Sequence, residues 1–238
     1  MRNKRAEIKK KKIKPIENNK IYLFRHGKTK NNERGFFTGQ SESKLTSRGI
    51  KDAKKVAKKL KDKKFAIAIH TSLSRSKDTL KEVLKFHPEC KKMIQDNRMT
   101  ERSYGDLEGT SHKSFIEKIG KKSYDLRVYG DAIENLSPNQ KKEVEKFLGE
   151  KEYRAIHRGY NIAAPNGESF AEVEKRVKKF ISWLIKYIKK NKVNVAISAH
   201  GNSIRLFRKI MEKASKEETV GWFIPYDKYF EYKIKVNK

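Results

Sequence analysis

Three short apolar runs, far apart in the chain, each end in a cluster of polar residues. The runs lie at residues 21–24, 66–69 and 193–198, and their β-branched, aliphatic and aromatic side chains are typical of buried strands. The polar clusters that follow them are Arg25-His26-Gly27, His70-Thr71-Ser72 and His200-Gly201. We therefore interpret each run as a buried strand that delivers polar side chains at its carboxyl end.

Amphipathic helices are predicted between these strands. A first helix runs from Thr46, the predicted N-cap, to Leu60, and a second over residues 74–86 is followed by Pro88 as a stop signal. A longer helix spans about 168–190, another extends to about Lys213, and a closing strand is expected near 229–236. The predicted inward positions of the first and the long helix are Ile50, Ala53, Val56, Ala57 and Leu60, and Phe170, Val173, Val177, Phe180, Ile181, Leu184 and Ile188. This alternation predicts an α/β fold, a three-layer α/β/α sandwich around a mostly parallel sheet.

Residues 98–165 interrupt this alternation. They hold polar turns and two predicted helices, near 111–119 and 138–148, so we expect a helical cap inserted into the sandwich. A chain of 238 residues can form one sizeable core, which predicts a single catalytic-type domain over residues 20–238. Residues 1–19 are rich in lysine and asparagine, and we expect them to form a disordered basic arm.

The composition limits the partners and the compartment. Fifty-nine Lys and Arg against 29 Asp and Glu give a net charge of +30, which attracts anions. The lysines lie along nearly the whole chain, however, as they do on solvated helix faces, so the charge alone identifies no partner. The single cysteine, Cys90, excludes an internal disulfide and fits a reducing compartment. With no apolar stretch of membrane-spanning or signal-peptide length, the protein is expected in the cytoplasm.

Four of the polar residues at the strand ends predict a phosphate site. In an open parallel sheet, ligands bind outside the carboxyl ends of the strands, so Arg25, His26 and His200 should meet at one edge. Arg75, one helical turn after the second strand, should join them. Guanidinium groups make bidentate, charge-assisted hydrogen bonds to phosphate oxygens, and an imidazole can attack phosphorus.

At this point the sequence resembles the histidine phosphatase superfamily, which includes cofactor-dependent phosphoglycerate mutases and many acid-type phosphatases. The resemblance covers nearly all of residues 20–236, and its motifs occur in the order typical of the family. These motifs are Arg25-His26-Gly27, Asn32, Thr38-Gly39, Leu45-Thr46 with Gly49, Thr71-Ser72-x-x-Arg75, Glu101-Arg102-x-Tyr104-Gly105-x-Leu107-x-Gly109, Gly167-Glu168-Ser169 and Ala199-His200-Gly201-Asn202-Ser203-Ile204-Arg205.

The resemblance implies a role for each catalytic residue. His26 would become phosphorylated, while Arg25, Arg75 and His200 would hold the oxygens of the transferring group. Glu101 would give and take the proton. Such a transfer depends mainly on positioning and electrostatic stabilisation, so no metal is expected.

The resemblance also implies a substrate class, a small anionic phosphoester, and a set of substrate-binding residues. Several segments look mutase-like, and they favour the interconversion of 3- and 2-phosphoglycerate with 2,3-bisphosphoglycerate as the primer. Arg158 would hold the carboxylate or the distal phosphate. The family's lysine aligns with His112, so that Lys113 is offset by one residue. The implied substrate-binding residues are Asn32, Thr38, Gly39, Arg102, Tyr104, His112, Lys113, Arg158, Gly201 and Asn202.

Two other functions stay open at this stage. A histidine-type phosphomonoesterase would use the same residues and pass the phosphoryl group to water. A nucleic-acid-binding protein is the third reading, prompted by the net charge of +30 and the basic arm. The cap should separate mutase from phosphatase, and we expect the insertion at about residues 120–152 to act as its lid. A homo-oligomer is possible.

Overall fold

The computed structural model describes residues 18–128 and 136–235. Most of the expected basic arm lies outside this part of the chain. Asn18 and Asn19, which we assigned to the arm, instead begin the first strand, β1 (Asn18–Arg25). Asn19 and Lys20 pair through their backbones with β5 (Tyr229–Lys235), so the folded domain starts two residues earlier than predicted.

The sheet has five strands in the order β3-β2-β4-β1-β5. The first four strands in this order run parallel, and β5 pairs antiparallel with β1 at one edge. Three of the predicted strands are therefore confirmed as β1, β2 (Ile67–His70) and β4 (Val195–Ala199), and the closing strand as β5. Sequence reasoning missed β3 (Lys92–Gln95), an edge strand whose mostly exposed residues form no apolar run.

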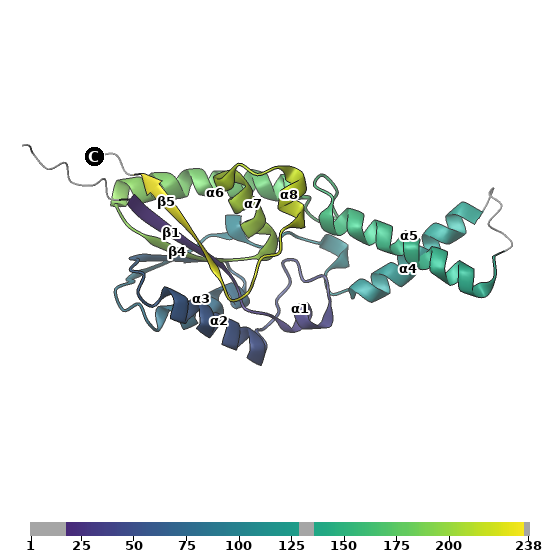
Figure 1. Ribbon diagram of the computed structural model, residues 1–238, viewed down its shortest axis with the longest axis horizontal. Coiled ribbons are helices and arrows are strands. Elements are labelled where there is room, and N and C mark those ends of the chain that lie inside the picture. The colour runs from purple at the N-terminus through teal and green to yellow at the C-terminus, as the bar shows by residue number, and fades with distance from the viewer. Residues whose placement is uncertain (1–17, 129–135, 236–238) are drawn as a thin grey trace, which may run out of the picture.

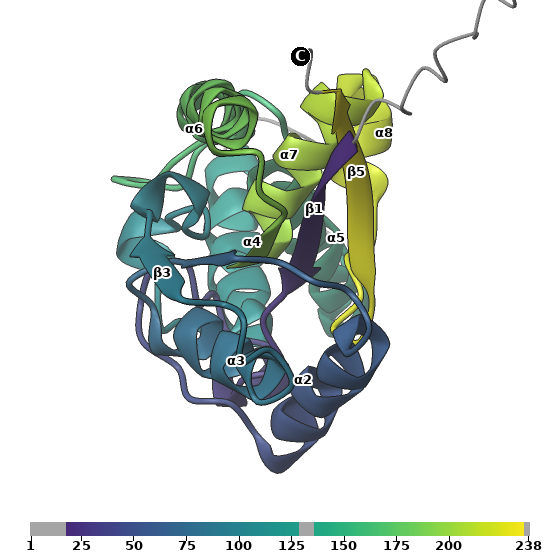
Figure 2. The same ribbon diagram turned by 90° about the vertical axis from the view of Figure 1, so that its left-hand side faces the viewer.

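Helices cover both faces of the sheet, as Figure 2 shows. Tyr22 and Phe24 of β1 pack against α2 (Ser47–Leu60) and α3 (Ser74–Leu84). Ile21 and Leu23 face the opposite way, into a second core formed with α6 (Phe170–Asn191) and α7 (Gly201–Glu212). Successive side chains of a strand point to opposite faces, so one strand supplies both cores. The three-layer α/β/α sandwich is thus present.

Most predicted helix features hold, with a few differences. Thr46 caps α2 by accepting a hydrogen bond from the backbone of Gly49, and all seven predicted inward positions of α6 are buried. Ile50 was expected to face the core but is 40% exposed, because the buried stripe of α2 begins at Gly49 and continues through Ala53. Four short helical elements were not predicted: α1 (Lys30–Arg34), α8 (Lys216–Gly221) and two 3₁₀ turns (Asn97–Met99 and Gly105–Leu107).

The inserted region forms a helical hairpin that projects from one end of the sandwich (Figure 1). Its helices, α4 (His112–Val128) and α5 (Pro138–Arg158), are both much longer than predicted. They cross closely at two glycines: a Cβ added to Gly120 would lie 2.0 Å from the carbonyl oxygen of Glu145, and one added to Gly149 would lie 2.0 Å from that of Ile116. In the part of the chain that the structure describes, no helix has the length and apolar character to cross a bilayer.

Candidate active site

The two histidines at the strand ends lie side by side. β1 and β4 are neighbouring parallel strands in which Arg25 pairs with Ala199, so the next residues, His26 and His200, leave the sheet at the same edge. Their ring centroids are 4.9 Å apart, and both side chains are buried. Gly27 comes next, and a Cβ at this position would lie 2.1 Å from the carbonyl oxygen of Gly49 at the start of α2. Only glycine therefore fits directly after His26.

The hydrogen bonds of His26 prepare its ring for attack. Its Nδ1 lies 2.7 Å from the carbonyl oxygen of Gly27, which can only accept, so Nδ1 carries the proton and Nε2 keeps a free lone pair. Burial, followed by the charges of Arg75 and Arg25, holds the pKa of His26 well below its usual value. The ring is therefore neutral near pH 7, as a nucleophile must be.

His200 lies beside His26 but is not among the residues that line the cavity. Its Nε2 lies 2.8 Å from the hydroxyl of Thr71 at the end of β2, and its Nδ1 is buried without a partner among the described residues. Burial and then Arg75, His26 and Arg25 lower the pKa of His200 well below its usual value. This ring is also neutral, so the positive charge beside His26 comes from the arginines.

Two arginines flank His26, Arg75 buried and Arg25 partly buried, and each is fixed by backbone carbonyls. Arg75 donates from both terminal nitrogens, to the carbonyls of Ser41 and Gly39, each at 2.7 Å. Arg25 donates to the carbonyl of Ile224 at 3.0 Å and lies over the ring of Tyr226 at 4.0 Å. These contacts leave part of each guanidinium group free for an anion, in a geometry set before the anion arrives.

The carboxylate of Glu101 opens on the same cavity. Its Oε1 accepts hydrogen bonds from the backbone nitrogens of Arg102, at 2.9 Å, and Asn202, at 3.0 Å. Because Asn202 lies in the first turn of α7, the positive end of that helix stabilises this carboxylate. Oε2 has no such backbone donor among the described residues, and this oxygen can exchange a proton with a substrate.

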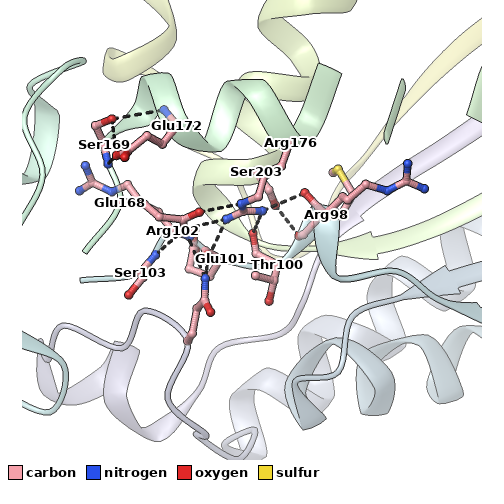
Figure 3. A network of polar contacts seen from close by, with 12 residues as sticks. Arg98, Thr100, Glu101, Arg102, Ser103, Glu168, Ser169, Glu172, Arg176 and Ser203 are labelled. Atoms are coloured by element: carbon pink, nitrogen blue, oxygen red, sulfur yellow. Dashed lines mark hydrogen bonds and ion pairs between the residues drawn. The ribbon is translucent and has the colours of Figure 1, made fainter. Parts of the chain in front are cut away.

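Arg176 of α6 holds the segment that carries Glu101 (Figure 3). Its guanidinium group binds both carboxylate oxygens of Glu168 and also donates to three backbone carbonyls, those of Arg98, Thr100 and Glu101, at 2.8–3.0 Å. Ser103 donates its backbone N–H to the same Glu168 carboxylate. Sequence reasoning missed Arg176, since a single arginine on a helix carries no motif.

A cavity of about 210 Å³ connects these groups. It reaches from His26 to the base of the hairpin, where both helix ends contribute residues. Four of the five predicted catalytic residues line it: Arg25, His26, Arg75 and Glu101. Eight of the predicted substrate-binding residues also line it: Asn32, Thr38, Gly39, Tyr104, His112, Arg158, Gly201 and Asn202.

Two predicted substrate-binding residues lie elsewhere. Arg102 is fully buried, between the rings of Tyr104 and Phe170, and donates to the carbonyl of Ile156 at 2.9 Å. It therefore fixes the end of α5 and does not reach the cavity. The side chain of Lys113 is 87% exposed and pairs with Glu117 on the outer side of α4. The one-residue offset from His112 turns this lysine away from the site.

The described residues of the expected lid do not line the cavity. No described residue between 120 and 152 lines the cavity, because the hairpin projects away from it and only its base, at His112, His157 and Arg158, takes part. The described residues also contain no group of three or more His, Cys, Asp or Glu side chains placed to hold a metal ion.

Sequence reasoning missed five residues that line the cavity. Phe36 and Phe37 come from the loop after α1, His157 and Phe223 flank the far end, and Arg205 lies one turn into α7. His157 lies in the last turn of α5, one residue before Arg158. Burial, then Arg158 and Arg102, lower its pKa to about 3, so it is neutral. Arg205 was within a quoted motif, but only its position beside Arg158 reveals a role.

Comparison with known proteins agrees with this geometry. The sequence-family model that describes the histidine phosphatase superfamily (branch 1) matches residues 21–134 and 133–226 of this chain. A 2,3-bisphosphoglycerate-dependent phosphoglycerate mutase of Chlamydia caviae is 32% identical over 217 residues, 89% of this chain and 92% of that protein. The mutase of the same name from Pseudoalteromonas atlantica is 29% identical over 85% and 88% of the two chains. A putative alpha-ribazole-5'-P phosphatase of Escherichia coli superposes with a TM-score of 0.67 at 19% identity, over 93% and 97%. The chain belongs to the histidine phosphatase superfamily.

Proposed function

We propose that this enzyme is a 2,3-bisphosphoglycerate-dependent phosphoglycerate mutase, which interconverts 3- and 2-phosphoglycerate in cytoplasmic glycolysis and gluconeogenesis. The observation that carries the proposal is a single cavity that both His26 and Arg158 line. A phosphoglycerate needs both, since its phosphoryl group must reach the nucleophile while its carboxylate needs a cation. Curated relatives that align along most of this chain carry the mutase name, which supports the same reaction.

The chain's own residues can perform each part of the transfer. Nε2 of His26 forms the bond to phosphorus while the P–O bond of the phosphoester donor breaks, and Glu101 gives a proton to the leaving oxygen. Arg25 and Arg75 stabilise the charge on the phosphoryl oxygens. When phosphohistidine passes its group on, the P–N bond breaks, a substrate hydroxyl forms the new P–O bond, and Glu101 accepts the hydroxyl proton.

The cavity also suits a bisphosphorylated primer. Four arginines, Arg25, Arg75, Arg158 and Arg205, line it against the single carboxylate of Glu101. These arginines would hold the two phosphates of 2,3-bisphosphoglycerate at opposite ends. The primer, when bound, supplies the first phosphoryl group of the cycle.

The test supplies 3-phosphoglycerate with and without primer and follows both 2-phosphoglycerate and free phosphate. We expect isomer formation that depends on the primer, and its loss in His26→Ala with unchanged thermal unfolding. His87→Gln is the matched control, because His87 packs on Phe65 away from the cavity. Rapid release of phosphate without isomer would overturn the mutase assignment.

A phosphomonoesterase is the second candidate, and one observation favours it. The hairpin leaves the cavity uncovered by residues 120–152 in the described structure, so water has access to the phosphoryl group. In that case water replaces the substrate hydroxyl as acceptor, with Glu101 as its base. The same assay separates the two reactions.

A further inference from the structure

Three arginines of the cavity are attached to one short stretch of backbone. Arg158, at the end of α5, donates to the carbonyl of Val220 at 2.8 Å. Arg205 of α7 donates from Nε to the carbonyl of Trp222 at 2.8 Å, and Arg25, at the end of β1, donates to that of Ile224 at 3.0 Å. Every second carbonyl of segment 220–224 thus binds one arginine, and each of these arginines lines the cavity.

Arg205 stands out among the three. Its side chain is buried, with the residue 8% exposed, and two of its three nitrogens are used within the protein: Nε on Trp222 and Nη1 on the side-chain oxygen of Asn202, at 2.6 Å. Its Nη2 has no acceptor among the described residues. This nitrogen is not among the fully buried polar atoms that lack a partner, so it is open to the cavity, where an anion can accept a charge-assisted hydrogen bond from it.

The positive charges around Arg205 also favour the binding of an anion. Burial, followed by the charges of Arg158 and Arg25, lowers the pKa of Arg205 to about 10, so the group is still charged near pH 7. The neighbouring imidazole of His157 is neutral and adds no charge. Glu101 is the one carboxylate among the residues that line the cavity, and its Oε1 already accepts two backbone hydrogen bonds. Like charges held together in a partly enclosed site are relieved when an anion binds.

We propose that Arg205 and Arg158 together bind the second anionic group of the substrate, a carboxylate or phosphate, and that segment 220–224 sets their distance from the phosphoryl site at Arg25. This assignment rests on the proposed function for the position of the phosphoryl group. It adds Arg205 and segment 220–224 as determinants of specificity. The enzyme should therefore prefer phosphoesters that carry a second anion over simple monoesters.

The test compares two ligands on a background that cannot turn over. In His26→Ala protein, the affinities for 3-phosphoglycerate and for inorganic phosphate are measured by calorimetry, with and without Arg205→Gln. Charge-assisted hydrogen bonds lost in Arg205→Gln should weaken 3-phosphoglycerate binding about tenfold or more and leave phosphate within about twofold. Arg154→Gln is the control: this arginine is exposed on α5, pairs with Glu150 and does not line the cavity.

Each outcome decides the proposal. Equal weakening of both ligands, no weakening of either, or a parent protein that does not prefer 3-phosphoglycerate over phosphate would each overturn it. If Arg205→Gln does not fold, Arg205→Lys is measured instead. It keeps the positive charge but loses the forked guanidinium donors, so we expect a smaller loss of affinity, confined to 3-phosphoglycerate. The mutase assignment fails separately, when the wild-type enzyme forms no isomer with primer, and that result leaves the binding comparison intact.

Discussion

Single residues in this site act largely through their backbone partners. Arg75, Arg25, Arg158 and Arg205 each use part of a guanidinium group to hold a carbonyl and leave the rest for the cavity. Only a group with five donors in a rigid fork can do both at once, which explains why arginine occurs at each of these positions and lysine does not.

No other cationic side chain should be able to take over the contacts of Arg176. In Arg176→Lys, a single ammonium group cannot reach Glu168 and three carbonyls, so the segment that carries Glu101 should shift. We expect kcat to fall about 10- to 100-fold with little change in KM, since a displaced proton donor slows the chemical step. Steady-state kinetics measure this split, and Arg154→Lys, exposed on α5, is the control. A change in KM alone would contradict the positioning role.

His157 should make the protein less stable in mild acid. Its pKa is about 3 in the folded state and about 6.5 when unfolded, so the unfolded chain binds more protons between these values. Stability therefore falls as pH drops below about 6.5. The free energy of unfolding in urea is measured at pH 7 and at pH 5. Its decrease between the two pH values should be smaller by about 1–2 kcal/mol in His157→Gln than in wild type. An equal loss in both proteins would rule out this residue as a source of acid sensitivity.

Residue-level prediction from the sequence succeeded where a motif places a residue at a strand end. His26 and Arg25 were found in this way, Glu101 was found through the family motif, and all three line the cavity. Arg102 was misassigned, because a motif does not say whether a side chain faces inward to the core or outward to a ligand. Arg205 has a place in the cavity that depends on contacts with a segment 17 residues further along, which no local pattern contains.

At the level of elements, the hairpin links its own packing to the cavity. α4 begins with His112 and α5 ends with His157 and Arg158, so the relative position of these helices decides where three cavity residues lie. Arg102 fixes the end of α5 to the sandwich through the carbonyl of Ile156. The hairpin is therefore part of the site, although most of its length lies away from it.

Substitution of Gly149 should test this link. A methyl group there would meet the backbone of Ile116, so Gly149→Ala should force the two helices apart and cost about 1–3 kcal/mol of stability. We expect a lower Tm and a higher KM for phosphoglycerate, because Arg158 moves with α5. Lys151→Ala is the control, since this residue is exposed on the same helix and does not line the cavity. A lower Tm with unchanged KM would separate the hairpin from the cavity.

The helices that were predicted well are those that cover the sheet. α2 and α6 each bury one apolar stripe against it, so their periodicity was visible. α4 and α5 pack mainly against each other and expose residues such as Leu126 and Phe147, which blurs their pattern. Their predicted ends fell short for this reason, and the edge strand β3 was missed because its residues are mostly exposed.

At the scale of the whole molecule, the strand order places the chemistry. β1 and β4 lie next to each other in the middle of the sheet and bring two distant histidines together, an arrangement that the strand-helix alternation already implied. The orientation of the inserted hairpin, in contrast, depends on contacts at its base that no repeating pattern encodes. The sequence therefore predicted the sandwich and the reactive end of the cavity better than its far end.

The antiparallel pairing of β5 with β1 has one further consequence. β5 follows segment 220–224 after a short link, and β1 ends at Arg25. The two sides of the cavity are therefore joined through one pair of strands. An insertion or deletion in the link at residues 225–228 would leave this pairing and the nucleophile in place while changing the reach of the pocket. Relatives that act on longer or shorter phosphoesters could arise through such changes of loop length alone.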